Sequence, residues 1–223
     1  MHLSVKNIVD LQENVKQKIN ELKYPNYNPK IIAVSKTFGM EDILPLIEFG
    51  HEHFGENKVQ EALSKWKEIK TNKNNIKLHM IGRLQSNKVK QAVAIFDYIH
   101  SIDSIKLAQK IAEEQIKQNK KLKFFLQVNI GEETQKSGVN LDNLNELVNE
   151  CKNIDLDIIG LMCLPPIDKP AGNYFSIIKR KNDELNFKEL SLGMSNDYID
   201  ALIYKTSFIR IGTKIFGERT KQF

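Results

Sequence analysis

Lys36 lies where a lysine side chain can do covalent chemistry. It directly follows the run Ile31–Ser35, in which four of five residues are apolar. If this run is a buried strand, the ammonium group of Lys36 emerges beside apolar neighbours, which lowers its pKa and favours the neutral amine that forms Schiff bases. A solvated surface lysine is the alternative, and the residue type alone leaves both open.

A second group of residues, near the C-terminus, suits phosphate binding. The segment Gly-Met-Ser at 193–195 ends one apolar run, and Gly212 and Thr213 end the next. Hydroxyls and backbone N–H groups at such positions bind phosphate where a helix begins, and we expect a helix to begin at Asn196. The alternative is that Ser195 or Asn196 only caps that helix.

Four polar side chains fall inside apolar runs. Arg210 shares a strand face with Phe208 by the period of two, so it should point into a core and needs a partner there; a structural ion pair is the alternative. His51 and His53 also share a face, but no third ligand stands nearby, which disfavours a metal site. For His79, a hydrogen-bonded core histidine and a ligand contact are both open.

Predicted strands position these residues. Eight apolar runs alternate with amphipathic helical patterns at a spacing of about 25 residues, which is the rhythm of βα units. The predicted strands cover residues 31–35, 51–55, 77–82, 98–102, 124–130, 157–164, 189–193 and 207–212. A predicted helix over residues 5–22 precedes them. Because several runs are continuously apolar, we expect a parallel sheet covered on its outside by helices.

A (β/α)8 barrel, the TIM barrel of the α/β class, fits this order of elements best. An open doubly wound sheet is the alternative, but its dinucleotide fingerprint G-x-G-x-x-G is absent. The sequence ends about ten residues after the eighth strand, which leaves no room for a final helix, so we expect the helix at 5–22 to complete the outer ring of a single domain, 1–223. Reactive groups of such barrels lie at the carboxyl ends of the strands, and the loops after strands 7 and 8 often hold phosphate.

Composition narrows the possible partners. Lys and Arg total 33 against 28 Asp and Glu, a net charge of +5, yet the basic residues are mostly lysines interleaved with Glu and Asn, which argues against nucleic acid. The N-terminal segment has no apolar core of a signal peptide, and no apolar stretch approaches the roughly 20 residues of a membrane span, so we expect no membrane partner and a cytoplasmic protein. Cys151 and Cys163 are too few for a disulfide framework or a zinc site, and we expect no metal.

Eight segments, each at the end of a predicted strand, also resemble a known family. They are VSKT (34–37), HFGENKVQE (53–61), HMIGRLQSNK (79–88), IHSID (99–103), QVNIGEETQKSG (127–138), GLMCLPP (160–166), LSLGMSND (190–197) and FIRIGTKIFGER (208–219). In this order and spacing they resemble the pyridoxal phosphate homeostasis proteins, the YggS-like family. The resemblance covers nearly the whole chain and implies a single barrel similar to the N-terminal domain of alanine racemase.

The resemblance implies a cofactor site for pyridoxal 5′-phosphate (PLP). The family lysine that holds PLP as a Schiff base is matched by Lys36. The phosphate contacts are matched by Ser195, Gly212 and Thr213. The arginine that faces the pyridine nitrogen is matched by Arg210.

Further family positions lie around the cofactor. Asn57, His79 and Met194 match residues that line its ring. Lys136 matches a second lysine near the barrel mouth, a secondary or transfer site. Two departures from the family concern only the rim: Arg83 stands where many members have proline, and the segment 165–173 is short.

The function implied by the resemblance is non-catalytic. It is reversible binding of PLP for intracellular PLP (vitamin B6) homeostasis by a monomer, with PLP-dependent apoenzymes as candidate partners. A PLP-dependent amino-acid racemase and a cofactor-free barrel enzyme for phosphorylated metabolites are the alternatives. Alanine racemase takes its opposite-face base from a second, β-rich domain, and the sequence stops at Phe223 before any such domain, which favours the carrier.

Overall fold

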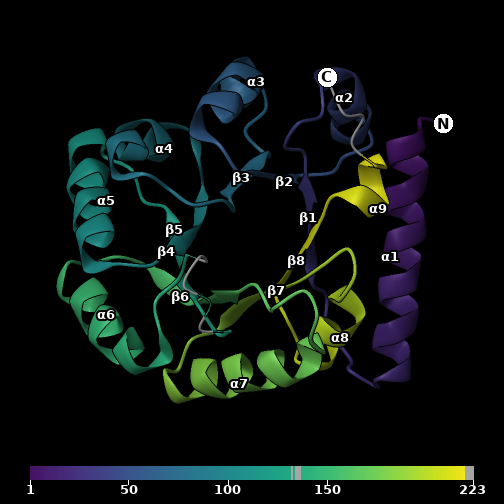
Figure 1. Cartoon of the computed structure of the whole chain (residues 1–223). Helices are drawn as coiled ribbons and strands as arrows, with labels where there is room; N and C mark the ends of the chain where they lie inside the picture. The colour runs from purple at the N-terminus through teal and green to yellow at the C-terminus, as the bar shows by residue number, and fades with distance from the viewer. Residues whose placement is uncertain (132, 134–136, 219–223) are drawn as a thin grey trace.

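Eight parallel strands pair side by side in chain order, and the last pairs with the first to close a barrel (Figure 1). This is a computed structural model, and it describes residues 1–131, 133 and 137–218. The strands are β1 (Lys30–Val34), β2 (His53–Glu56), β3 (Lys77–Met80), β4 (Tyr98–Ile102), β5 (Lys123–Val128), β6 (Ile158–Cys163), β7 (Glu189–Met194) and β8 (Phe208–Ile211). The predicted (β/α)8 barrel is confirmed, and each of the eight predicted runs contains a strand.

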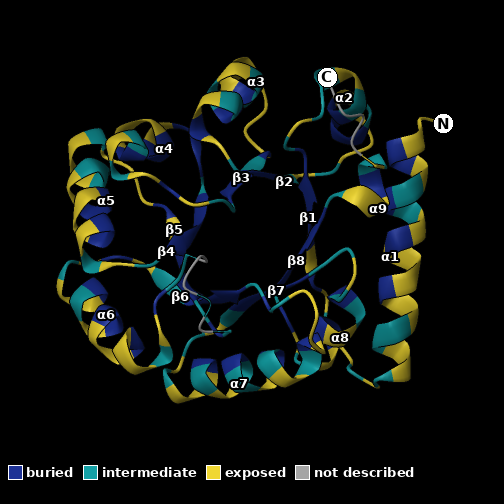
Figure 2. Ribbon diagram, in the orientation of Figure 1, coloured by how far each residue is buried: buried dark blue, intermediate teal, exposed yellow. Residues whose placement is uncertain are grey.

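Helices surround the barrel as an outer ring. They are α1 (Leu3–Glu21), α2 (Met40–Glu48), α3 (Val59–Asn72), the 3-10 turn η1 (Ser86–Lys88), α4 (Val89–Ile95), α5 (Ile105–Gln118), α6 (Leu141–Asn153), α7 (Ala171–Glu184), α8 (Tyr198–Ile203) and α9 (Thr213–Phe216). Buried residues line the strands and the inward faces of these helices, and exposed residues occupy the outward faces (Figure 2). Among the described residues, no helix is long and apolar enough to cross a membrane.

The N-terminal helix takes the place in the ring that was predicted for it. In Figure 1, α1 stands between α2 and α8, against α9. The Asn7 side-chain amide donates to the Ile215 carbonyl at 2.9 Å, and this bond joins α1 to α9. The expectation that no helix follows the eighth strand is wrong by one turn, because α9 forms directly after β8.

Side chains alternate between two cores along each strand. Ile209 and Ile211 of β8 point outward into the large core beneath the helices. Phe208 lies inside the barrel with Ile32, Tyr98, Phe125 and Met162. The carboxyl ends of all eight parallel strands meet at one end of this inner core, and that end is the place where chemistry is expected.

The predicted strand at 51–55 differs from the structure at its start. β2 begins at His53, because the chain before it ends helix α2. Gly50 has a φ of +97° there, and the His51 N–H donates to the Leu46 carbonyl at 2.9 Å. His51 therefore belongs to the helix end and does not share a strand face with His53.

Candidate ligand site at the carboxyl end of the barrel

The predicted site residues lie on neighbouring strands. Around the barrel, β7 pairs with β8, β8 with β1, and β1 with β2. Lys36 follows β1 and Asn57 follows β2, while Ser195 and Thr213 follow β7 and β8. The topology therefore gathers these four residues along one arc of the barrel mouth.

The residue before Lys36 is held by two other elements. Ser35 is buried; its hydroxyl donates to Glu56 Oε1 at 2.7 Å, and its carbonyl accepts from Lys65 Nζ at 2.8 Å. Lys65 also forms an ion pair with Glu56 at 2.8 Å, and Trp66 Nε1–H donates to the same carboxylate at 3.0 Å. This group fixes the end of β1 from which Lys36 extends.

The residue after Lys36 is held in an unusual conformation. Thr37 has a φ of +69°, a left-handed conformation that costs about 1–2 kcal/mol for a residue with a side chain. Its N–H donates to Glu61 Oε1 at 2.5 Å, and Lys65 Nζ lies 2.8 Å from the same atom. Burial acts to raise the pKa of Glu61, but Lys65 and the Thr37 N–H outweigh it and lower the pKa. The ionised Glu61 therefore stabilises the strained turn beside Lys36.

Asn57 presents a buried acceptor at the mouth. Its Oδ1 is buried and makes no hydrogen bond within the described part of the chain. A Cβ at Gly82 would overlap the Asn57 carbonyl oxygen, so only glycine lets the loop after β3 approach this closely. A buried polar atom without a hydrogen bond costs about 1–3 kcal/mol. Since Asn57 follows β2 and Lys36 follows the neighbouring strand β1, this acceptor suits a ligand with a hydrogen-bond donor at the barrel mouth.

The loop after β7 is a tight turn that ends before the helix. The Met194 N–H donates to Asp197 Oδ1 at 2.5 Å, and the Asp197 N–H donates to the Met194 carbonyl at 3.1 Å. The predicted helix start at Asn196 is therefore wrong by two residues: α8 begins at Tyr198, and Asp197 is its N-cap residue. The alternative in which Ser195 or Asn196 caps the helix is also wrong.

The end of β7 depends on glycine, and the end of β8 leads directly into a helix. Gly193 has a φ of +89°, and a Cβ there would lie 2.9 Å from Tyr198 Cα. Gly212 precedes α9, and its carbonyl accepts from the Ile215 and Phe216 N–H groups at 2.9 Å. The first N–H groups of α9 thus follow β8, and Ser195 follows β7, the strand that pairs with β8, so both lie at the barrel mouth where a phosphate site is expected.

Arg210 lies inside the barrel below this mouth. It is 4% exposed, and its NH1 donates to the Ser191 carbonyl at 2.6 Å and to Ser191 Oγ at 2.7 Å. NH2 donates to the Cys163 carbonyl at 3.0 Å. The predicted inward direction is confirmed, and within the described residues the hydrogen-bond partners of Arg210 are neutral groups rather than the carboxylate of a structural ion pair. Since a guanidinium has five N–H groups, these three bonds leave donors for a ligand.

Comparison with known proteins places this site in a family. The profile of the alanine racemase N-terminal domain matches residues 7–220. A pyridoxal phosphate homeostasis protein of Pasteurella multocida is 33% identical over 224 residues, covering 96% of both chains. One of Aquifex aeolicus is 36% identical over 200 residues, covering 85% of this chain and 87% of that protein. The chain belongs to the pyridoxal phosphate homeostasis protein family.

Solved structures agree with this assignment. PipY of Synechococcus elongatus, a structure with PLP bound, superposes with a TM-score of 0.80 at 31% identity and covers 91% of this chain and 100% of that one. Alanine racemase of Clostridium difficile superposes with a TM-score of 0.70 at 17% identity over 94% of this chain and 58% of the racemase. The second likeness concerns the fold alone.

His79, which was predicted to line the cofactor ring, lies deeper in the barrel than the mouth. His79 is fully buried in β3, with its Nε2 2.9 Å from His53 Nδ1 and its Nδ1 2.9 Å from His100 Nε2. Its ring stacks on Tyr98 with centroids 4.3 Å apart. Both ring nitrogens thus contact other histidines, and a direct contact of His79 with a cofactor stays a prediction.

Three residues that the structure places at or below the site had no role in the sequence analysis, and one predicted residue is not among those described. Lys65, His100 and Ser191 had no predicted role, although His79 and His100 share one signal: each is the third residue of its strand. Lys136, the predicted secondary lysine, lies outside the described residues. Cys163 is buried, and burial raises the pKa of its thiol to about 12.

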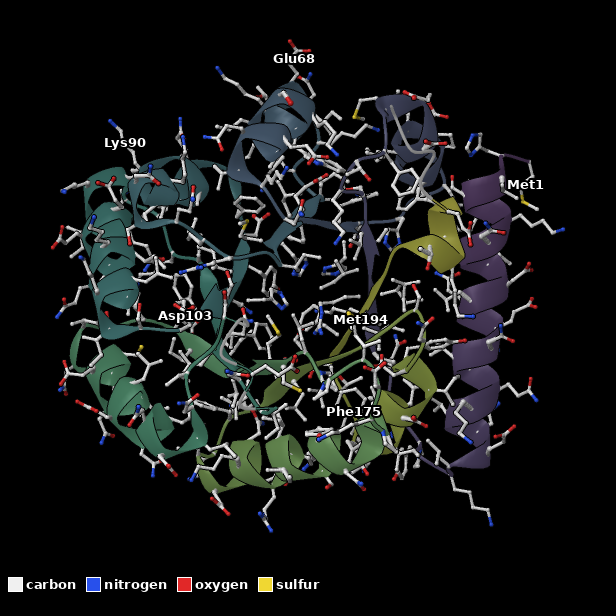
Figure 3. All side chains as sticks on the ribbon, viewed as in Figure 1. Met1, Glu68, Lys90, Asp103, Phe175 and Met194 are labelled. Atoms are coloured by element: carbon white, nitrogen blue, oxygen red, sulfur yellow. The ribbon has the colours of Figure 1, made fainter. Side chains whose placement is uncertain are left out.

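The inner and outer surfaces of this family member differ plainly. Figure 3 shows Met194 and Asp103 on the inner side of the ring of helices, whereas Glu68 and Lys90 extend away from it. Burial raises the pKa of Asp103, and Arg83 acts in the opposite direction.

Among the described residues, no three His, Cys, Asp or Glu side chains come together as a metal site would need.

Proposed function

We propose that this chain binds PLP reversibly at the carboxyl end of its barrel and serves PLP homeostasis without enzyme activity of its own. The observation that carries the proposal is the arrangement on neighbouring strands: a lysine after β1, hydroxyls and helix N–H groups after β7 and β8, and a buried arginine between them. The residues present fit the cofactor, since Asn57 Oδ1 and the remaining donors of Arg210 are polar groups suited to a polar ligand.

Lys36 is the proposed point of covalent attachment. PLP, when bound, supplies an aldehyde that takes up an amine with loss of one water and releases it again on hydrolysis. Lys36 Nζ attacks only as the neutral amine, so it gives up a proton first. The hydrogen bonds around Ser35 and Thr37 keep the backbone of Lys36 in one place, which lowers the entropy lost on attachment.

The other residues bind and orient the cofactor. The hydroxyls of Ser195 and Thr213 and the first N–H groups of α9 hold the phosphate. Arg210 would donate to the pyridine nitrogen, and Asn57 and Met194 would border the ring. Residues 1–223 act as one domain and as a monomer in this proposal, with PLP-dependent apoenzymes as recipients of the cofactor.

The expected absence of turnover rests first on Arg210. PLP is an effective electron sink when its ring nitrogen is protonated, and an arginine that donates to this nitrogen opposes protonation. Alanine racemases are distant relatives in fold, so the test includes their reaction. The purified protein with PLP is incubated with the common amino acids in deuterated water, and racemisation, transamination, decarboxylation and deuterium at Cα are measured. Turnover above about 1 per second would overturn the carrier and favour the racemase.

Binding itself is tested by titrating the purified protein with PLP. We expect a visible absorbance band of the protein–cofactor imine that borohydride abolishes, and one modified peptide, that of Lys36, by mass spectrometry. A protein that stays colourless at all PLP concentrations would exclude the proposal and favour a cofactor-free barrel enzyme.

A further inference from the structure

A row of polar side chains, half-buried at His53 and buried beyond it, crosses the interior of the barrel and ends on Arg210. His53 Nδ1 lies 2.9 Å from His79 Nε2, and His79 Nδ1 lies 2.9 Å from His100 Nε2. His100 Nδ1 lies 2.9 Å from Ser191 Oγ, which accepts from Arg210 NH1 at 2.7 Å. We call these five residues the interior chain. It joins the amino-terminal end of β2 to the residue proposed to face the cofactor ring.

Arg210 sets the direction of every hydrogen bond in the interior chain. A guanidinium only donates, so Ser191 Oγ accepts from it, and the Ser191 hydroxyl proton is available for His100 Nδ1. A neutral His100 then carries its single N–H on Nε2 and donates to His79. By the same rule His79 donates from Nε2 to His53. If His100 Nδ1 instead donated to Ser191 Oγ, this oxygen would accept from both His100 and Arg210, and the Ser191 hydroxyl proton would have no acceptor in the interior chain.

The surroundings keep these rings neutral and in place. Burial lowers the pKa of both His79 and His100 well below the usual value. His79 stacks on Tyr98, and His100 stacks on Phe125 with centroids 4.4 Å apart. A protonated ring would point an N–H at a neighbouring N–H, so the chain is complete only with neutral imidazoles.

We infer that His79 and His100 are positioning residues for the cofactor site, because through Ser191 they fix the guanidinium of Arg210. Ser191 Oγ, the end of the interior chain, accepts a hydrogen bond from the guanidinium of Arg210. Hydrogen bonds in such a row strengthen one another. Arg210 is thereby held with its other donors available to the cofactor. This inference rests on the proposed function, in which those donors meet the pyridine nitrogen.

The direction of the chain is tested without cofactor. Nitrogen-15 NMR of the histidine rings reports which ring nitrogen carries the proton, and His79→Phe and His100→Phe variants assign the signals. We expect His79 and His100 to be neutral and protonated on Nε2 at neutral pH. Protonation of either ring on Nδ1, or of both nitrogens, would overturn the inference.

The effect on the cofactor site is tested with a matched pair of serine variants. Ser191→Ala removes the hydroxyl between His100 and Arg210, whereas Ser101→Ala removes a buried hydroxyl that makes no hydrogen bond among the described residues. For Ser191→Ala we expect a His100 tautomer that is no longer fixed, about a tenfold loss of PLP affinity and a shifted visible band of the bound cofactor. Ser101→Ala should change none of these.

The outcomes separate this inference from the proposed function. If wild-type protein binds PLP and Ser191→Ala changes neither the visible band nor the affinity, the positioning role is wrong and the proposed function stands. If wild-type protein does not bind PLP at all, the proposed function fails and the positioning role fails with it, even where the tautomers are as expected.

Discussion

At the scale of single residues, the proposed site combines one reactive group with several residues that position this group or bind the cofactor. Lys36 is the reactive group of the proposal, and the residues on either side of it are tied to Glu56, Glu61 and Lys65. The proposed phosphate ligands are different in kind, since Ser195 is half-buried and Thr213 exposed at the mouth. Substitution at these two positions should therefore affect the ligand more than the fold.

Ser195→Ala and Thr213→Ala are each expected to weaken PLP binding. A hydrogen bond to a charged phosphate is worth roughly 1.5–3 kcal/mol, which corresponds to a loss of affinity of about tenfold or more. The measurement is a PLP titration followed by absorbance, with the unfolding midpoint as a check that both variants fold. Ser64→Ala, on the exposed face of α3, is the control and should bind PLP as the wild type does. Unchanged affinity in both test variants would place the phosphate elsewhere.

At the scale of elements, α3 supports the lysine loop from outside the barrel. The side chain of Lys65 is 12% exposed, and that of Glu56 is fully buried. Their contact, together with the bond from Lys65 to the Ser35 carbonyl, joins α3, β2 and the end of β1. An ion pair this deep is sensitive to the loss of one partner, because the other charge stays buried.

Lys65→Met is accordingly expected to lower the free energy of unfolding by about 3 kcal/mol, since it leaves Glu56 and Glu61 without their cation. Urea unfolding measures the change, and Lys67→Met, an exposed lysine on the same helix, is the control with a change within about 0.5 kcal/mol. Equal stability of the two variants would show that the Lys65 cluster contributes nothing to the fold.

The strands were predictable from the sequence because several are continuous apolar runs and all eight alternate with amphipathic helical patterns. The arc of Lys36, Asn57, Ser195 and Thr213 followed from the rule that strand ends meet. What was not predictable depends on cross-strand register: nothing in the local pattern shows that His79 and His100 touch. Lys65 was missed for a related reason, since a lysine on an amphipathic helix ordinarily faces solvent.

At the scale of the whole molecule, the barrel interior links stability to pH. His53 borders the inner core, and burial, followed by the nearby charge of Lys30, lowers its pKa to about 4 from 6.5. Between these two values the unfolded chain binds more protons than the folded one, so stability rises with pH. The contribution of neutral His53 to the free energy of unfolding is complete above pH 6.5 and is lost as the pH falls toward 4. His79 and His100 act in the same direction.

The free energy of unfolding is therefore expected to fall between pH 7 and pH 5, by roughly 2 kcal/mol from His53 alone. Urea unfolding at several pH values measures this slope. In His53→Gln, the fall in the free energy of unfolding between pH 7 and pH 5 should be smaller than in the wild type by roughly 2 kcal/mol, whatever the substitution does to stability at pH 7. A His53→Gln slope equal to that of the wild type would refute the assignment to His53.

The most direct test of the central proposal is borohydride trapping on two matched lysine variants. Lys36→Ala and Lys58→Ala, the latter an exposed lysine near the same end of the barrel, are mixed with PLP, reduced and analysed by mass spectrometry. We expect one reduced adduct on the Lys36 peptide of Lys58→Ala and none on Lys36→Ala, although Ser195 and Thr213 can still hold PLP noncovalently in the latter. An adduct on Lys36→Ala in the amount found for the wild type would contradict the assignment of Lys36 as the attachment site.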